Sequence, residues 1–135
     1  MTLHVAKPNA ELTEKEVTAI VVGSRSRPGI ARLMGWRCYH TLRSKGSEPG
    51  YPDWTLVRER IVFLELKTEA GKVSPAQADW IVALEAAGGE IYVVRPRHID
   101  SIAWVLRGQF RPRVGEHPAM DELEIELAHA TERAA

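Results

Sequence analysis

The apolar residues of this chain gather in short runs, separated by polar segments that contain proline or glycine. Runs rich in Ile, Val, Phe and Leu are typical of strands buried in a sheet. The alternation of residues 36–41 predicts a first strand, and the apolar runs predict three more over 54–58, 61–67 and 91–94. Because only Glu59 and Arg60 separate the second strand from the third, we expect these two strands to form a hairpin.

Helices are predicted where a capping residue precedes an amphipathic segment. Thr13, with Glu16 three residues later, offers a capping box for a helix whose apolar face begins at Val17. The proline and glycines of residues 23–29 interrupt this helix, and a second short piece is expected over 30–34.

A third helix is predicted to begin after Ser74, where Gln77 completes another capping box, and to end at Gly88. Its buried stripe is expected to consist of Trp80, Ile81, Leu84 and Ala87. Since this helix joins two buried strands, we expect a right-handed crossover with parallel strand pairing.

The rest of the chain is predicted as an extended lead-in over 1–11, a helix over 101–106, a loop over 109–118 and an acidic helix over 120–133. The apolar positions of the last helix, Leu123, Leu127 and Ala130, could dock on the domain or on a second subunit. Together the elements predict an α/β fold with a central mixed sheet of four or five strands and helices on both faces.

Charged side chains interrupt the apolar strand 61–67. Because side chains alternate along a strand, Glu65 and Lys67 point to the same face as Phe63. Burying charge is costly unless the charge is paired or bound to a metal, so one interpretation is a structural Glu65–Lys67 ion pair. The hairpin, however, also brings Asp53 to this end of the sheet, and two acids can hold a hard divalent cation while the lysine acts on what the cation binds.

These residues resemble the signature of the PD-(D/E)XK nuclease superfamily, Pro52-Asp53 followed by Glu65-Leu66-Lys67. A longer pattern is similar to that of its VRR-NUC branch and comprises Gly50-x-Pro52-Asp53, Glu65-x-Lys67, Ser74-Pro75-x-Gln77-x-x-Trp80, Gly88-Gly89 and Val93-Val94-Arg95. The sequence departs from the branch at Pro96, where a second arginine is the rule. The resemblance implies a restriction-endonuclease-like core over 12–108, with a loop and an acidic helix over 109–135.

The resemblance further implies an endonuclease that uses Mg²⁺ or Mn²⁺ to hydrolyse phosphodiester bonds in DNA. The ligands would be Asp53, Glu65 and the backbone carbonyl of Leu66. Lys67 would position or deprotonate the attacking water, or stabilise the charge that develops on the phosphate. Gln77 has a sufficient role as a helix cap, and the resemblance adds a supporting role in catalysis.

Members of the family also place an acid near the start of the first helix, where it completes the metal site. Glu14 is the first choice for this role in the present sequence. Glu16 is the alternative, although capping already explains a glutamate at that position.

The formal charge of the 135-residue chain is zero, but the charges are unevenly distributed. From residue 116 onward there are six acids and one arginine, which leaves 17 basic and 12 acidic residues in 1–115. The basic residues between 25 and 45 suit phosphate contact, with a solvated face as the alternative. Those expected to contact DNA are Arg25, Arg27, Arg43 and Lys45.

An apolar content of 44% and a charged content of 27% are typical of globular domains. Because no signal segment or membrane span is visible, we expect a cytoplasmic protein without a membrane partner. The single Cys38 excludes an internal disulfide and is expected to be a small buried hydrophobe. His40 could act as a base, but a lone histidine on a strand is more often packed or exposed.

Stand-alone domains of the VRR-NUC type are associated with homodimers that act on branched DNA. The resemblance therefore implies a homodimer that cuts Holliday-type junctions or flaps, with the apolar seam of 120–133 as the candidate contact. Two other interpretations remain open: a non-catalytic DNA-binding or assembly module that retains the fold, and an unrelated α/β protein with a chance motif.

Overall fold

A computed structural model describes residues 7–42 and 45–132 of the chain. Its elements, in chain order, are η1 (Asn9–Glu11), α1 (Glu14–Val21), α2 (Ile30–Leu33), β1 (Arg37–His40), β2 (Trp54–Val57), β3 (Ile61–Leu66), α3 (Pro75–Ala86), β4 (Glu90–Val94), η2 (Pro96–His98), α4 (Ile99–Arg107) and α5 (Pro118–Thr131). The 3₁₀ turn η1 replaces part of the extended lead-in predicted for 1–11, of which residues 1–6 lie outside the described residues.

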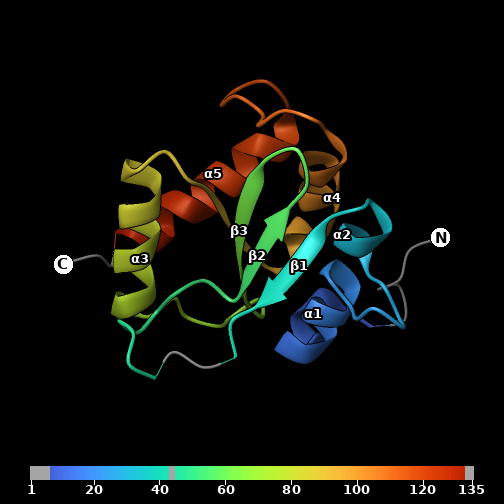
Figure 1. Ribbon diagram of the computed structural model, residues 1–135, viewed down its shortest axis with the longest axis horizontal. Helices are drawn as coiled ribbons and strands as arrows, with labels where there is room; N and C mark the ends of the chain where they lie inside the picture. The colour runs from blue at the N-terminus through green and yellow to red at the C-terminus, as the bar shows by residue number, and fades with distance from the viewer. Residues whose placement is uncertain (1–6, 43–44, 133–135) are drawn as a thin grey trace.

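The strands form one mixed sheet in the order β1-β2-β3-β4, which confirms the α/β fold at the level of a four-stranded sheet flanked by helices (Figure 1). β2 pairs antiparallel with both β1 and β3. β3 and β4 are parallel, as the crossover through α3 predicts. The hairpin between β2 and β3 is also confirmed.

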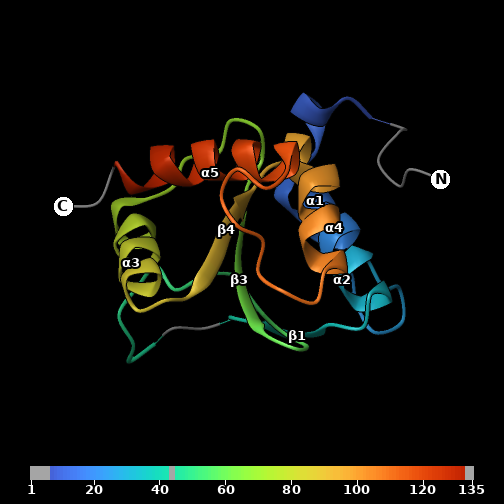
Figure 2. The same cartoon turned by 90° about the horizontal axis from the view of Figure 1, so that it is seen from above.

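Helices cover the two faces of the sheet unequally (Figure 2). Val62, Leu64 and Leu66 of β3 point into a main core that α1, α2 and α4 close. Phe63, on the opposite face, packs against a smaller core that α3 helps to form. The alternation predicted for this strand, with Glu65 on the face of Phe63, is therefore confirmed.

Both predicted capping boxes are present and define where α1 and α3 begin. The Thr13 and Ser74 side chains each accept a hydrogen bond from the amide three residues later, and the side chains of those later residues, Glu16 and Gln77, accept from the Thr13 and Ser74 amides. The predicted break after α1 is also found, since Gly23 adopts a φ of 67° and bridges to Pro28.

Two packing predictions need correction. The buried residues of α3 are Ala78 and Ile81, whereas Ala87 is exposed because the helix has already ended at Ala86. Trp80 and Leu84 are half-buried. Cys38 is half-buried rather than buried, because it lies on the edge strand β1.

The apolar seam of α5, formed by Leu123, Leu127 and Ala130, is buried inside the domain. Leu123 belongs to the main core, while Leu127 and Ala130 belong to the smaller one, so the helix crosses the β4 side of the sheet and closes both cores. All three side chains are buried within this chain. The seam is therefore unable to supply the contact between subunits that the sequence suggested, and the first alternative, docking on the domain, holds.

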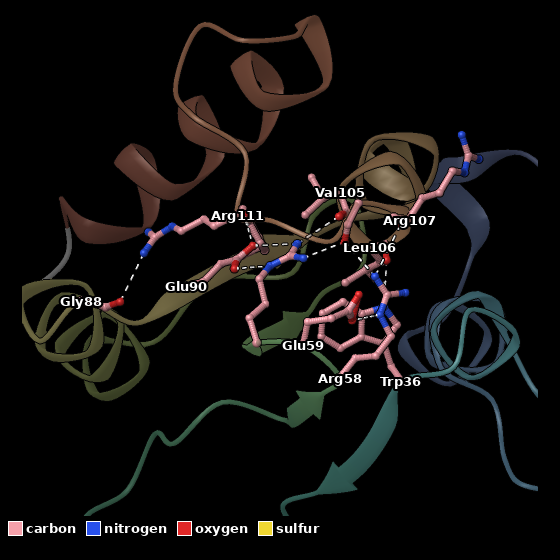
Figure 3. Close-up of polar contacts among 12 residues, drawn as sticks. Trp36, Arg58, Glu59, Gly88, Glu90, Val105, Leu106, Arg107 and Arg111 are labelled. Carbon is pink, nitrogen blue, oxygen red and sulfur yellow. Dashed lines mark hydrogen bonds and ion pairs between the residues drawn. The ribbon is translucent and has the colours of Figure 1, made fainter.

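At the end of the sheet opposite the predicted site, side chains cap the C-terminal end of α4 (Figure 3). A helix leaves its last carbonyls without intrahelical partners. Arg60 donates to the carbonyls of Val105 and Gly108, and the Trp36 indole donates to that of Leu106. Arg60 also forms a buried ion pair with Glu90 at 2.7 Å. Among the helices of residues 7–42 and 45–132, none is both long and apolar enough to cross a membrane.

Candidate functional site

Asp53, Glu65 and Lys67 come together at one end of the sheet. In the β2–β3 hairpin Trp54 lies opposite Leu64, so Asp53, one residue earlier, lies opposite Glu65. The Asp53 Oδ2 atom accepts a hydrogen bond of 3.0 Å from the Leu66 amide. Lys67 Nζ lies 3.4 Å from Glu65 Oε2. The register of one hairpin thus produces the convergence that the sequence predicted.

The Glu65 carboxylate is the most deeply buried group of the site, with 2% of the residue exposed. Burial and, second, the negative charge of Asp53 raise its pKa to about 8. Lys67 acts in the opposite direction but does not compensate for these two effects. The Asp53 charge therefore disfavours ionisation of Glu65, which is an electrostatic arrangement that a divalent cation would relieve.

Leu66 takes part through its backbone. In an extended strand the N–H and C=O of one residue point to the same side, and the Leu66 N–H points to Asp53. Its carbonyl is therefore directed to the side of Asp53, while the next amide, that of Lys67, bonds to Val94 on β4. This placement is compatible with the predicted role of the Leu66 carbonyl as a ligand.

Gln77 forms the predicted helix cap and also contacts Glu65. Its Oε1 atom accepts from the Ser74 amide at 2.9 Å as part of the capping box. Its Nε2 atom donates to Glu65 Oε2 at 2.9 Å. The first turn of α3 is therefore tied directly to the buried carboxylate.

The loop before β2 is pressed against the same turn of α3. Gly50 has a φ of 97°, and a Cβ atom built there would lie 2.4 Å from the carbonyl oxygen of Ala76. Only glycine combines this conformation with such a close approach. Tyr51 adds edge-to-face ring contacts to Phe63 and Trp80. These contacts fix the backbone that carries Asp53.

The structure does not bring Glu14 into this cluster. Glu14 is exposed and lines a hollow of about 480 Å³ beside α1, together with Lys15, Thr18, Ala19, Gly23, Ser24, Arg27 and His40. Within residues 7–42 and 45–132 no three His, Cys, Asp or Glu side chains lie close enough to hold a metal ion. Because α1 packs on the main-core face of the sheet and Glu65 leaves the other face, the predicted third acid is missing from the group.

Glu16 remains a capping residue. Its carboxylate accepts from the Thr13 amide and pairs with Lys7 at 2.7 Å. The hydrogen bond from Lys7, followed by that from Thr13, lowers its pKa to about 2. His40 stacks on Trp54, with ring centroids 4.3 Å apart, and is exposed next to the site.

The basic residues predicted to meet DNA are only partly described. Arg25, Arg27 and Lys45 are exposed. Arg43 lies outside the described residues. Arg27 shares the hollow with His40, and so flanks the β1 side of the site.

Two buried residues beside the site were not predicted to belong to it. The Arg95 side chain bonds to the loop that follows Lys67, and Glu126 of α5 pairs with Arg95. Arg95 was singled out only as part of a motif, and Glu126 only as one acid of an acidic helix. The contact joins segments far apart in the sequence, so a local pattern contains no signal for it.

No protein-family model, curated protein or solved structure compared with this chain matches it. The geometry of Asp53, Glu65 and Lys67 is therefore the observation on which a function can be proposed.

Proposed function

We propose that this protein is a metal-dependent endodeoxyribonuclease with a restriction-endonuclease-like core of the PD-(D/E)XK, VRR-NUC type. The observation that carries the proposal is the convergence of Asp53, Glu65 and Lys67 on one sheet face. A buried carboxylate, a second carboxylate and a lysine at the end of two paired strands form an expensive arrangement for a purely structural purpose.

The donor set fits a hard cation such as Mg²⁺ or Mn²⁺, because it consists of oxygen atoms: the Asp53 and Glu65 carboxylates and the Leu66 carbonyl. Bound there, the cation would supply a water of lowered pKa and positive charge for the phosphate oxygens. With two acids in the group instead of three, solvent and the DNA phosphate would have to provide the remaining ligands of a bound cation.

The residues of the chain divide the remaining work. Lys67 orients the attacking water or stabilises the negative charge that grows on the phosphate. Gln77 holds the Glu65 carboxylate through its 2.9 Å hydrogen bond and so fixes the position of that oxygen donor. The water oxygen would attack phosphorus and give up a proton to solvent, while the bond to the 3′ oxygen breaks and that oxygen takes a proton from solvent, which leaves a 5′-phosphate and a 3′-hydroxyl end.

The test is cleavage of labelled linear duplex, flap, single-stranded and four-way DNA, with Mn²⁺ or with EDTA. Asp53→Asn and Lys67→Ala should each abolish cleavage but keep the fold and most of the DNA binding, because the exposed basic residues expected to contact the backbone phosphates, such as Arg25 and Arg27, are unaltered. Asp100→Asn and Arg113→Ala, which alter exposed residues outside the site, are the matched controls and should cleave normally. Cleavage in EDTA, or by either site variant, would refute the mechanism.

Binding of DNA without cleavage of any substrate by the unaltered protein would instead support a non-catalytic DNA-binding or assembly module. That outcome would leave the fold assignment untouched while removing the enzymatic one.

We also propose that the protein acts as a homodimer on branched DNA, either Holliday-type junctions or flaps. One domain with one site presents a single cleavage centre, whereas a two-fold dimer presents two sites to symmetric strands. Because the α5 seam is buried, we place the contact between the two subunits on the part of the sheet face that α3 does not cover. Tyr39, Val57 and Ile61 lie on this face and are exposed by 69%, 40% and 54%.

A further inference from the structure

Residues 68–73 connect two parts of the candidate site. The segment leaves Lys67 at the end of β3 and enters α3 at Ser74, whose capping box contains Gln77. It also folds back on the lysine, since a Cβ atom built on Gly71 would lie 3.7 Å from Lys67 Cδ. The conformation of this segment therefore affects both Lys67 and the turn that binds Glu65.

One buried side chain holds the segment. Arg95 Nη1 lies 2.7 Å from the carbonyl oxygen of Thr68, 3.3 Å from that of Glu69 and 2.6 Å from that of Gly71. Three neighbouring carbonyls thus converge on one guanidinium group, and Arg95 is only 8% exposed. Hydrogen bonds from a charged donor are stronger than neutral ones, so the guanidinium restrains the loop where no helix or strand does.

The C-terminal helix holds the arginine in turn. Glu126 of α5, itself buried, pairs through Oε1 with Arg95 Nε at 3.1 Å. The same oxygen lies 2.9 Å from Arg97 Nη2, and the Arg97 amide bonds to the Glu69 carboxylate at 2.7 Å. Because a buried guanidinium without a counter-charge is unfavourable, Glu126 stabilises the Arg95 side chain in this position.

We propose that Arg95, fixed by Glu126, is a positioning residue that sets the conformation of 68–73 and thereby the placement of Lys67 and Gln77 around Glu65. The catalytic part of this inference rests on the proposed nuclease function. Under this proposal α5 contributes to the geometry of the site through Glu126, although the helix follows the segment in which the nuclease motifs occur.

The protein contains a matched control for this arrangement. Arg60 also forms an ion pair with a buried glutamate, Glu90, at 2.7 Å, and also donates to carbonyls, those of Val105 and Gly108. Figure 3 labels Glu90 and Val105 of this group. Glu90 begins β4, whereas Arg95 follows its end, so the control pair lies at the other end of the same strand. It has the same chemistry without a link to 68–73.

The experiment compares Arg95→Met and Glu126→Gln with Arg60→Met and Glu90→Gln in the whole chain, all at one temperature below the Tm of every variant. Hydrogen exchange of the amides of 68–73 is the first readout and needs no activity. We expect exchange there to accelerate about tenfold or more in the Arg95 and Glu126 variants and to stay near the unaltered protein in the Arg60 and Glu90 variants.

The second readout is cleavage kinetics with Mn²⁺. Arg95→Met should lower kcat about tenfold or more while KM for DNA changes little, because misplacement of Lys67 affects the reaction and not the phosphate contacts. Glu126→Gln keeps the side-chain volume and should show a smaller loss of the same kind, so it serves if Arg95→Met fails to fold.

Unchanged exchange over 68–73, or an equal acceleration in the Arg60 and Glu90 variants, would overturn the positioning role. So would accelerated exchange with kcat unaffected. If the unaltered protein cleaves no DNA, the nuclease proposal fails separately, and the exchange data alone still decide whether Arg95 and Glu126 fix the segment.

Discussion

The Glu65 carboxylate has polar neighbours with opposing effects on its charge. Burial and Asp53 raise its pKa, whereas Lys67 favours the ionised form. Gln77 contributes a neutral donor at 2.9 Å. A carboxylate that is well positioned yet poorly neutralised by its own protein is the type of group that attracts a cation or a substrate.

The position of Glu14 leads to a prediction that differs from the pattern of the VRR-NUC family, in which an acid of the first helix completes the metal site. Because Glu14 is exposed and is not grouped with Asp53 and Glu65, Glu14→Gln should change the Mn²⁺ concentration for half-maximal cleavage by less than about threefold. Loss of a metal ligand, or of the residue that supports it, typically lowers metal affinity or activity by roughly 10–100-fold.

Cleavage at varied Mn²⁺ measures this concentration, and Glu16→Gln is the comparison variant. Glu16→Gln should lower Tm, because it removes the ion pair with Lys7 and weakens the capping box, and leave the metal dependence unaltered. A tenfold weaker metal dependence in Glu14→Gln would show that α1 contributes to the site after all.

His98 predicts how stability responds to pH. Burial and, second, the Arg97 charge lower the pKa of its imidazole, with Arg95 acting in the same direction and Glu126 and Glu69 against it. Its Nδ1 atom accepts from the Arg95 amide at 3.0 Å, which requires an unprotonated Nδ1 atom. The folded pKa therefore lies below the unfolded value of about 6.5.

Since the unfolded chain then binds more protons, the stability that neutral His98 contributes is complete above pH 6.5 and decreases as the pH falls below that value. His98→Asn keeps an acceptor but has no titration in this range. The decrease in Tm between pH 7 and 5 should therefore be smaller in the variant than in the unaltered protein, and an equal decrease would contradict the assignment.

Among the elements, the loop before β2 offers a clean comparison between two glycines. Gly50 and Gly46 both have positive φ, 97° and 84°, so alanine is strained at either position. A Cβ atom at Gly50 would also collide with Ala76, whereas one at Gly46 has nothing within 4 Å.

Gly46→Ala should therefore cost about 1 kcal/mol in the free energy of unfolding, and Gly50→Ala about 2–4 kcal/mol. Because Gly50 supports the backbone of Asp53, its variant should also lose cleavage activity under conditions where it is folded. Urea unfolding and cleavage assays measure the two effects, and equal destabilisation would mean that the loop moves away freely.

For the whole molecule, the burial of the α5 seam separates stability from association. Leu127→Ala should lower the free energy of unfolding by about 2–5 kcal/mol without changing the oligomeric state, because Leu127 belongs to the smaller core. Val57→Lys, on the open sheet face, should leave the fold intact and convert the proposed dimer to a monomer.

Light scattering at micromolar concentration distinguishes the two variants from the unaltered protein. The dimer should also cut four-way DNA faster than linear duplex, and Val57→Lys should lose that preference. A monomeric unaltered protein, or equal rates on both substrates, would remove the dimer proposal and leave the nuclease proposal standing.

The sequence by itself determined the features that depend on neighbours along the chain. The capping boxes at Thr13 and Ser74, the break between α1 and α2 and the β2–β3 hairpin were all predicted, because each is decided within a few residues. The alternation of β3 and the hairpin register also sufficed to bring Asp53, Glu65 and Lys67 together. The cap formed by Gln77 followed from its position three residues after Ser74, whereas its hydrogen bond to Glu65 was suggested only by the family resemblance.

Only the tertiary structure decided which distant surfaces meet. It placed Glu14 away from the two acids, buried the apolar seam of α5 in two cores, and brought Glu126 to Arg95. An amphipathic pattern shows that a helix has a face to bury but not what covers that face. A charged residue likewise has no local signature of its partner, because the packing of whole elements determines which opposite charge lies within reach.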